Sequence, residues 1–142
     1  MSPQHLIVDR VAMLRQAALF AATPGRFLAG LASRLEEVSF TAGDMLITSG
    51  ATEEWLLVLV QGEVQVSRPD GRVRMGPVNT IGELSVLDPG PRIADVMAVT
   101  DGWAFRLGKE DFDEALRLRP EIGAGIITAL VRRLREMHER IE

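Results

Sequence analysis

Residues 56–75 read LLVLVQGEVQVSRPDGRVRM, and this stretch indicates the fold class. The valines of the EVQVS segment alternate with polar residues, as they do in a strand that buries one face. The PDG turn follows, in which proline presets φ, aspartate bonds its own backbone and glycine accepts a positive φ. We therefore predict a hairpin that joins the strands Glu63–Ser67 and Arg72–Met75.

The same rhythm extends from Glu37 to Leu107. Short apolar runs are interrupted by glycine or proline at intervals of about 8 to 12 residues, which is typical of an antiparallel roll or sandwich. The predicted strands are Glu37–Phe40, Met45–Thr48, Leu56–Gln61, Glu63–Ser67, Arg72–Met75, Asp95–Ala98 and Ala104–Leu107.

Helices are predicted on both sides of this region. Apolar residues recur at helical spacing over Val8–Phe20, and Thr23-Pro24 has the residue types of an N-cap and a first helical position for a second helix that reaches Leu35. Two more helices are predicted at Lys109–Leu118 and from Pro120 to Ile141. The predicted fold class is α+β, mainly β: an antiparallel β-roll or jelly roll flanked by N-terminal helices (about 8–35) and C-terminal helices (about 109–141), in one domain over residues 1–142.

The composition excludes several kinds of site. The 142 residues are 46% hydrophobic and 25% charged, the balance of one globular domain. The formal net charge of -4 disfavours direct nucleic-acid binding, which needs a basic face. Cysteine is absent, which excludes disulfides and zinc thiolates, and His5 and His138 are too far apart in sequence to suggest a histidine metal site. No apolar run approaches the length of a membrane span of about 18 residues and no signal pattern opens the chain, so we expect a cytoplasmic protein.

The segment from Ile81 to Ala94 reads IGELSVLDPGPRIA and carries the chemistry. Connections of this length inside a compact domain are often functional. Gly82 allows a ligand to approach the backbone, and residues 84–87 can form a short helical turn with N–H groups toward an anion. Arg92 offers a planar donor fork that suits phosphate, and Glu83 is an acceptor for sugar hydroxyls. The segment predicts a site for a small phosphorylated anion.

The order GELSV, five residues, then RIAxVxA resembles the phosphate-binding cassette of the cyclic-nucleotide-binding domain family. That family includes the catabolite activator protein and the regulatory subunits of cAMP-dependent kinase. Upstream, Leu46-Ile47-x-x-Gly50 followed by LLVLxxG at 56–62 is similar to a second pattern of the family. The resemblance extends from about Leu14 to the last helix.

The resemblance implies a role for each residue of the cassette. Glu83 accepts a hydrogen bond from the ribose 2′-hydroxyl and Arg92 pairs with the cyclic phosphate. Main-chain N–H groups of Ser85, Ile93 and Ala94 complete the cradle. The implied ligand-binding residues are Gly82, Glu83, Leu84, Ser85, Arg92, Ile93 and Ala94. The implied function is a regulatory domain that senses cAMP, or cGMP, passes the signal through its flanking helices, holds no cofactor and catalyses nothing.

Two positions depart from the family pattern. Ile93 stands where the family mostly has Ala, Ser or Thr, and a hydroxyl there is associated with cGMP, so the isoleucine favours cAMP. A β-branched side chain can also crowd the phosphate, which leaves open a degenerate module used for dimerisation or docking without nucleotide. Glu53 stands where the upstream motif usually has a small residue, and we expect it to affect a loop rather than the pocket.

Structural alternatives stay open beside these roles. Glu83 and Arg92 could form a plain ion pair, and Trp55 and Trp103 are expected to be packing residues. A cupin-like enzyme would need histidine ligands on the strands, and the sequence has none between Glu37 and Leu107.

The last predicted helix bears on partners. Its apolar stripe predicts a face buried on the roll or a homodimer contact, whereas its arginines predict a solvated face. The stripe consists of Ile122, Ile126, Leu130, Leu134, Met137 and Ile141, and the arginines are Arg132, Arg133 and Arg135. The stripe continues to the end of the chain at Glu142, which suggests a longer polypeptide with a fused or separate effector.

Overall fold

The computed structural model describes residues 6–141, and the chain divides into two compact units. Residues 35–112 form the first unit, which we call the roll. Residues 6–34 and 113–141 belong to the second, which we call the helical unit. His5 and Glu142, which the sequence analysis discussed, lie outside the described residues. The prediction of one domain over residues 1–142 stays a prediction.

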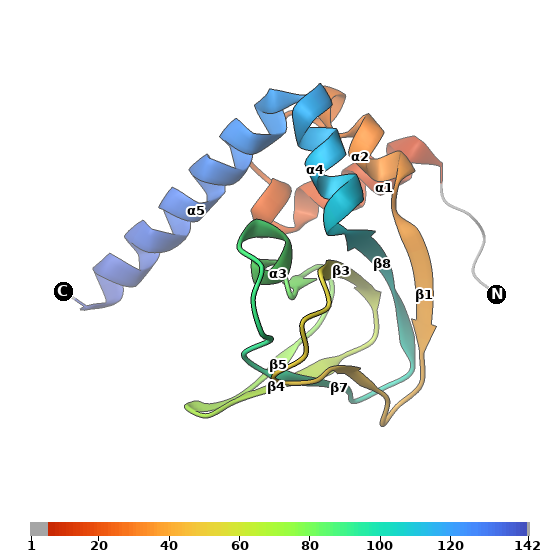
Figure 1. Cartoon of the computed structure of the whole chain (residues 1–142), viewed down its shortest axis with the longest axis vertical. Helices are drawn as coiled ribbons and strands as arrows, with labels where there is room; N and C mark the ends of the chain where they lie inside the picture. Colours follow the sequence, from red (N-terminus) through yellow and green to blue (C-terminus); the bar gives the residue numbers. More distant parts are fainter. Residues whose placement is uncertain (1–5, 142) are drawn as a thin grey trace. The chain divides into compact units, whose positions relative to one another are not determined.

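The roll consists of two four-stranded antiparallel sheets, ordered β1-β8-β3-β6 and β2-β7-β4-β5 (Figure 1). Helix α3 lies between β6 and β7, and helix α4 begins at the end of β8. The elements are β1 (Glu36–Phe40), β2 (Met45–Ile47), β3 (Trp55–Gln61), β4 (Val64–Arg68), β5 (Gly71–Met75), β6 (Thr80–Ile81), α3 (Leu84–Leu87), β7 (Asp95–Ala98), β8 (Gly102–Gly108) and α4 (Lys109–Leu118). The predicted fold class is confirmed.

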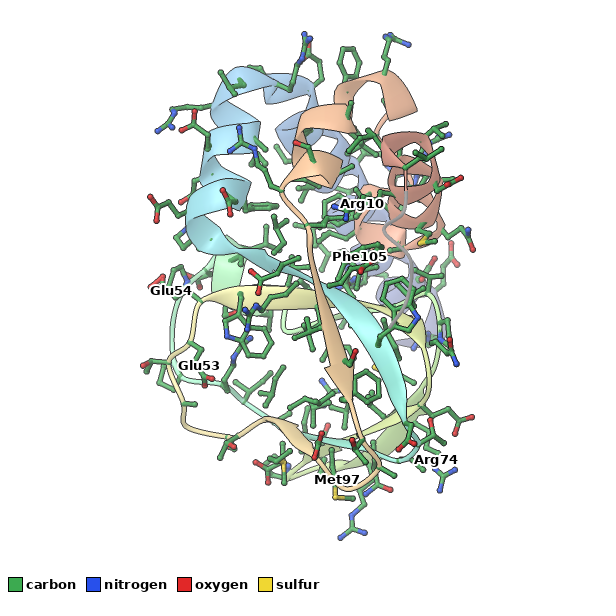
Figure 2. All side chains as sticks on the ribbon, turned by 90° about the vertical axis from the view of Figure 1, so that its right-hand side faces the viewer. Arg10, Glu53, Glu54, Arg74, Met97 and Phe105 are labelled. Atoms are coloured by element: carbon green, nitrogen blue, oxygen red, sulfur yellow. The ribbon has the colours of Figure 1, made fainter. Side chains whose placement is uncertain are left out.

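The core of the roll lies between the two sheets. Inward-facing side chains of both sheets form one buried cluster, because successive residues of a strand point to opposite faces. Strand β7 shows the alternation: Val96 and Ala98 are buried, whereas Met97 is 37% exposed and its side chain lies on the outside (Figure 2). The cluster contains Phe40, Leu57, Leu59, Ile81 and Ala104 from one sheet and Ile47, Val64, Val96 and Ala98 from the other.

The predicted hairpin is confirmed, with Val66 opposite Val73 and Arg68 opposite Gly71. The other predicted strands are present, with ends that differ by at most two residues. The sequence missed β6, which pairs with β3 through Leu57 and Ile81. Two residues are too few for an alternation of apolar and polar side chains to show.

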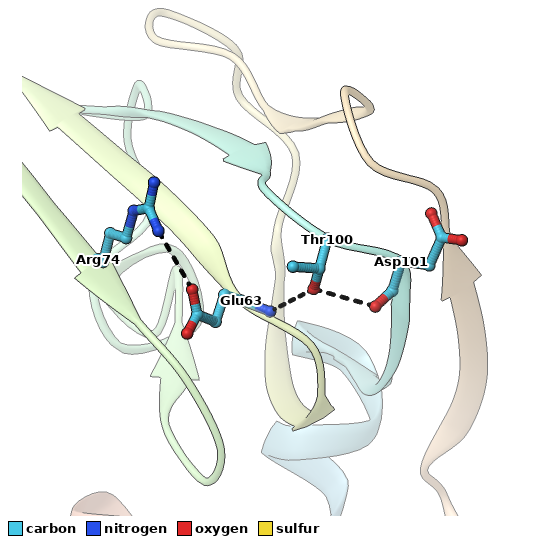
Figure 3. Close-up of polar contacts among 4 residues, drawn as sticks. All are labelled: Glu63, Arg74, Thr100 and Asp101. Carbon is cyan, nitrogen blue, oxygen red and sulfur yellow. Dashed lines mark hydrogen bonds and ion pairs between the residues drawn. The ribbon is translucent and has the colours of Figure 1, made fainter.

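Polar contacts tie the turn before β4 to the turn before β8 (Figure 3). The main-chain N–H of Glu63 donates to Thr100 Oγ1 at 3.0 Å, and the Thr100 hydroxyl donates to the Asp101 carbonyl at 3.1 Å. The Glu63 carboxylate lies 3.4 Å from Arg74 Nη1. These contacts fix two loops that connect the sheets, and none of the four residues borders the cavity inside the roll.

The helical unit confirms the C-terminal predictions and corrects the N-terminal ones. Helices α4 and α5 have the predicted bounds, but the predicted helix Val8–Phe20 ends at Gln16 because Ala17 is extended (φ -79°, ψ 135°). A 3-10 turn follows in which Leu19 and Phe20 are fully buried. Residues 8–20 contain no glycine or proline and favour one continuous helix. The burial of Leu19 and Phe20 outweighs this helical propensity. The remaining elements are α1 (Ile7–Gln16), η1 (Ala18–Phe20), η2 (Gly25–Phe27), α2 (Ala29–Ser33) and α5 (Pro120–Ile141).

The predicted N-cap at Thr23 is wrong. Thr23 is fully buried, and its hydroxyl has no hydrogen-bond partner among residues 6–141. The side chain packs on Gly125 of α5, where an added Cβ would collide with Thr23 Oγ1. Pro24 instead flanks the short turn η2 with an extended ψ of 139°.

The apolar stripe of α5 is divided between burial and exposure. Ile122 and Ile126 are at most 4% exposed, whereas Leu134 and Met137 are 61% and 50% exposed. The side chain of Ile141 lies outside the described part of the chain. Within the described residues, no helix is long and apolar enough to cross a bilayer.

Candidate anion-binding site

The roll contains a cavity of about 190 Å³. Strand side chains that line it include Ile47, Val66, Met75 and Val96. All seven residues predicted from the sequence border it as well: Gly82, Glu83, Leu84, Ser85, Arg92, Ile93 and Ala94. The structure therefore brings together every residue of the predicted site.

Gly82 begins the segment that borders the cavity, and only glycine fits there. Its φ is +78°, in the left-handed region that other residues avoid. A Cβ at this position would also collide with Arg92 Nη1. The positive φ and the absent side chain together let Arg92 approach the backbone.

The Arg92 side chain is 6% exposed. Nη1 donates to the Gly82 carbonyl at 3.0 Å and to Ser85 Oγ at 2.6 Å, and Nη2 donates to the Trp55 carbonyl at 2.8 Å. The guanidinium carbon lies 4.6 Å from the centroid of the Trp55 ring, a distance at which a cation is attracted to the ring face. Among the described residues, the buried Nε has no hydrogen-bond partner, and three of the five N–H groups of the guanidinium are paired. The Nε–H and one Nη2–H are therefore left for acceptors that the described residues do not supply.

Two opposing effects act on the charge of Arg92. Burial lowers the pKa of Arg92, and the carboxylate of Glu53 raises it. Arginine stays protonated in proteins, so the site presents a fixed positive charge. Glu53 itself is exposed and does not line the cavity, so the expectation that it affects a loop rather than the pocket stays a prediction.

The main chain of Arg92 is fixed by the segment that precedes β3. Its N–H donates to the Ala51 carbonyl at 2.7 Å, and its carbonyl accepts from the Gly50 N–H at 2.8 Å. Both backbone and side chain of Arg92 are therefore held by residues 50–55.

Ser85 takes part through its hydroxyl. Besides accepting from Arg92, Oγ lies 2.8 Å from the Gly82 carbonyl and 3.1 Å from the Trp55 carbonyl, to either of which it can donate its one proton. Its main-chain N–H donates to the Gly82 carbonyl at 3.2 Å. The N–H groups of Val86 and Leu87 donate to the Glu83 carbonyl. Helix α3 is present as predicted, but these three N–H groups are paired within the segment rather than directed at an anion.

The residues next to Arg92 differ in exposure. Ile93 is 57% exposed and Ala94 is 9% exposed. In the described residues, the N–H groups of Ile93 and Ala94 donate to no backbone carbonyl. Across the cavity segment, Leu84 is 52% exposed and Glu83 is half-buried. Ile93 and Ala94 thus leave two main-chain donors without a carbonyl partner in the segment that borders the cavity.

Sequence reasoning missed two supports of the site. Trp55, expected to be a packing residue, does pack against the core cluster but also supports the guanidinium. Lys109 donates from Nζ to the Val86 carbonyl at 3.2 Å and from its main-chain N–H to the Glu54 carbonyl at 2.9 Å, which ties α3 to the start of α4. Main-chain acceptors leave no trace in a sequence, so neither contact could be foreseen.

Among the described residues, no group of His, Cys, Asp and Glu is arranged to hold a metal ion.

A β-roll whose inter-strand segment borders a cavity and carries a buried arginine is the arrangement of a small-ligand binding domain. The chain belongs to the cyclic nucleotide-binding domain family, whose model matches residues 37–118.

Known proteins are similar to this chain over most of its length. A CRP-like cAMP-activated global transcriptional regulator of Mycobacterium tuberculosis is 30% identical over 135 residues, which are 91% of this chain and 60% of that protein. A cAMP-dependent protein kinase regulatory subunit of Aspergillus fumigatus is 32% identical over 74% of this chain and 26% of its own length. The crystal structure of the N-terminal domain of a transcriptional regulator from Streptomyces coelicolor matches with a TM-score of 0.78 and 36% identity, covering 92% of this chain and 95% of that domain. The chain thus spans less than two thirds of the length of the first relative and about a quarter of the second.

Proposed function

We propose that the domain is a regulatory sensor that binds cAMP in the cavity of the roll. The observation that carries this proposal is Arg92: a buried guanidinium on the cavity wall whose Nε lacks a partner. A cyclic phosphate supplies the missing acceptor and a negative charge, and charge-assisted hydrogen bonds of this kind contribute about 1.5–3 kcal/mol each.

The other contacts that we propose are those of the cassette pattern, whose residues border the cavity. The N–H groups of Ile93 and Ala94 donate to the phosphate, and Glu83 accepts from the ribose 2′-hydroxyl. Gly82 and Leu84 shape the segment. A phosphate-binding role for the Ser85 N–H requires it to leave the Gly82 carbonyl, whereas its hydroxyl positions Arg92 in any case.

Ile93 supports cAMP rather than cGMP as the ligand. Its side chain is exposed beside the cavity and has no hydroxyl to donate to a guanine base. The same exposed, bulky side chain favours the second candidate, a degenerate module that binds no nucleotide and serves in dimerisation or docking.

The output lies outside the roll. If the domain has two arrangements of the flanking helices, a ligand that binds one of them more tightly shifts the equilibrium toward it. The size of the shift is set by the difference in affinity between the two arrangements. The two full-length relatives are a transcriptional regulator and a kinase regulatory subunit, so the effector, fused or separate, is not specified by this fold. We also propose that the domain catalyses nothing, acts in the cytoplasm and forms a homodimer through the exposed part of α5.

Isothermal titration calorimetry with cAMP tests the sensor function. We expect binding by the wild type and a loss of at least about 100-fold in affinity for Arg92→Ala, from two or more lost charge-assisted bonds. Arg74→Ala, at a residue outside the cavity, is the control and should bind as the wild type does. Thermal unfolding of each variant verifies that the fold is intact. Equal heats for wild type and Arg92→Ala would show that Arg92 does not carry the binding and would contradict this proposal. No heat for either protein would support the degenerate module.

A further inference from the structure

Strand β4 brings a second guanidinium to the cavity. Val64, Val66 and Arg68 lie on one face of the strand, because side chains two residues apart point to the same side. Val64 is buried in the core cluster, and Val66 and Arg68 both line the cavity, whereas Ser67 between them does not. Among the described strand residues that line the cavity, Arg68 is the only charged one.

The residues on either side of Arg68 are small. Arg68 pairs with Gly71 of β5, and the space that a Cβ of Gly71 would occupy is open. On the other side, Ser67 pairs with Asp95 of β7, so Arg68 comes next to Ala94, the residue before β7. Opposed residues of neighbouring antiparallel strands have Cβ atoms about 4.5–5.5 Å apart. Neither neighbour therefore covers Arg68 with a bulky side chain.

Ala94 connects Arg68 to the anion-binding site. Its N–H and that of Ile93 donate to no backbone carbonyl of the described residues, and Arg92 Nε, two residues earlier, lacks a partner among them. An anion held by these donors lies within reach of the long Arg68 side chain, because Arg68 is beside Ala94 and lines the same cavity.

The Arg68 side chain has no competing partner. It is exposed, and among residues 6–141 no hydrogen bond or ion pair involves it. By contrast, Arg74 on β5 and Arg106 on β8 pair with Glu63 and Glu36. A guanidinium suits phosphate oxygens because its N–H groups form a planar fork.

The charges around the cavity also require a second cation. Glu83 and Asp88 line it together with Arg92, so the charged side chains of the cassette include one more carboxylate than guanidinium. A phosphate that enters is attracted by Arg92 but repelled by both carboxylates. Arg68 restores the balance from the strand wall.

We propose that Arg68 is a second phosphate-binding residue, which contacts the phosphate from β4 while Arg92 holds it from the cassette. For nucleotides this inference rests on the proposed function, since the phosphate is then that of the cyclic nucleotide. The cassette pattern does not include position 68, so the contact adds a strand residue to the site.

The test compares Arg68→Gln with Arg72→Gln. Arg72 is exposed on the same hairpin, opposite Ser67, and does not line the cavity, so its loss changes the net charge equally. Both variants are titrated with cAMP by calorimetry at low ionic strength, and thermal unfolding verifies the fold. We expect Arg68→Gln to lose affinity about three- to tenfold, between the effects of an exposed ion pair and of a charge-assisted hydrogen bond. Arg72→Gln should bind as the wild type does.

Dimethyl phosphate separates this inference from the proposed function, because it carries the singly charged diester without ribose or base. Its binding is followed by NMR at the amide signals of Ile93 and Ala94. We expect Arg68→Gln to bind it more weakly than Arg72→Gln does, by about the factor found for cAMP. If cAMP does not bind the wild type but dimethyl phosphate shows this difference, the sensor function fails and the role of Arg68 stands.

Three other outcomes overturn the role of Arg68. If cAMP binds through Arg92 but Arg68→Gln binds it as Arg72→Gln does, the role is wrong and the sensor function stands. A loss for cAMP without a matching loss for dimethyl phosphate places the contact on the base or the ribose, which also contradicts a phosphate contact. Binding of neither ligand to the wild type overturns both proposals.

Discussion

The Arg92 guanidinium is oriented by its own protein before any ligand arrives. Carbonyls of Gly82 and Trp55 and the hydroxyl of Ser85 accept from its two terminal nitrogens, and the Trp55 ring lies against it. A donor that is already oriented loses little conformational entropy on binding. Affinity at this site should thus depend on the residues that hold Arg92 as well as on Arg92 itself.

Ser85→Ala tests this dependence. The substitution removes the acceptor that lies 2.6 Å from Arg92 Nη1. A hydrogen bond to a charged group contributes about 1.5–3 kcal/mol, and the affinity loses only the share of it that orients the guanidinium for the ligand. We expect cAMP affinity in calorimetry to fall about two- to tenfold while the protein stays folded. Ser67→Ala on β4, at a residue that does not line the cavity, is the matched control. Unchanged affinity in Ser85→Ala would show that the hydroxyl does not position the arginine.

Ile93→Thr should change the preference between bases. It places a hydroxyl at an exposed position beside the cavity, where one added hydrogen bond to guanine would raise cGMP affinity relative to cAMP by up to about tenfold. Competition binding with both nucleotides measures this ratio. Ile93→Val keeps the β-branch without the hydroxyl, so an equal change in both variants would assign the effect to side-chain size.

At the scale of elements, α5 packs on η1 and comes closest to the N-terminal segment at Gly125 and Thr23. Alanine is the better helix former, yet an alanine Cβ at 125 would collide with the Thr23 side chain. Gly123, two residues earlier, has only an ordinary contact with Leu116 at 3.9 Å. Of these two glycines, Gly125 is therefore required by a close contact, whereas Gly123 has room for a side chain.

Thermal and urea unfolding distinguish these glycines. We expect Gly125→Ala to lower the free energy of unfolding by about 1–3 kcal/mol through overpacking. Gly123→Ala should raise it by up to about 1 kcal/mol, because alanine favours the helix. A Gly125→Ala variant as stable as Gly123→Ala would mean that Thr23 moves aside without cost.

Prediction from the sequence succeeded where the signal is local or periodic. Strand alternation, the turn at 69–71 and the stripe of α5 gave the correct elements, and all seven residues named from the cassette motif border the cavity. It failed where tertiary packing decides, as at Ala17 and Thr23, or where main-chain carbonyls are the partners, as for Arg92 and Lys109. Glu53 was noticed as a departure from the motif, but its effect on Arg92 needed coordinates.

At the scale of the whole molecule, the apolar residues of α5 that stay exposed predict self-association. Ile127, Val131, Leu134 and Met137 are between 40% and 65% exposed and recur at helical spacing, which is typical of a helix that packs on a partner. A second copy of this helix is the partner that we propose.

Sedimentation velocity over a range of concentrations tests the dimer. We expect the wild type to dimerise and Leu134→Glu to be monomeric, because a charge in the contact is costly to bury. Thr128→Glu, also at an exposed position of α5, should dimerise as the wild type does. A wild type that is monomeric at all concentrations, or a Leu134→Glu dimer, contradicts the proposal.

The stacking of Arg92 on Trp55 has a practical consequence. A cation close to an indole alters the energy of its excited state, so the emission of Trp55 should respond when a bound phosphate neutralises the charge of the guanidinium that lies against the ring. The chain has only one other tryptophan, Trp103, which lies outside the cavity lining and can be replaced by phenylalanine. The domain would then report its own occupancy optically, with no dye attached.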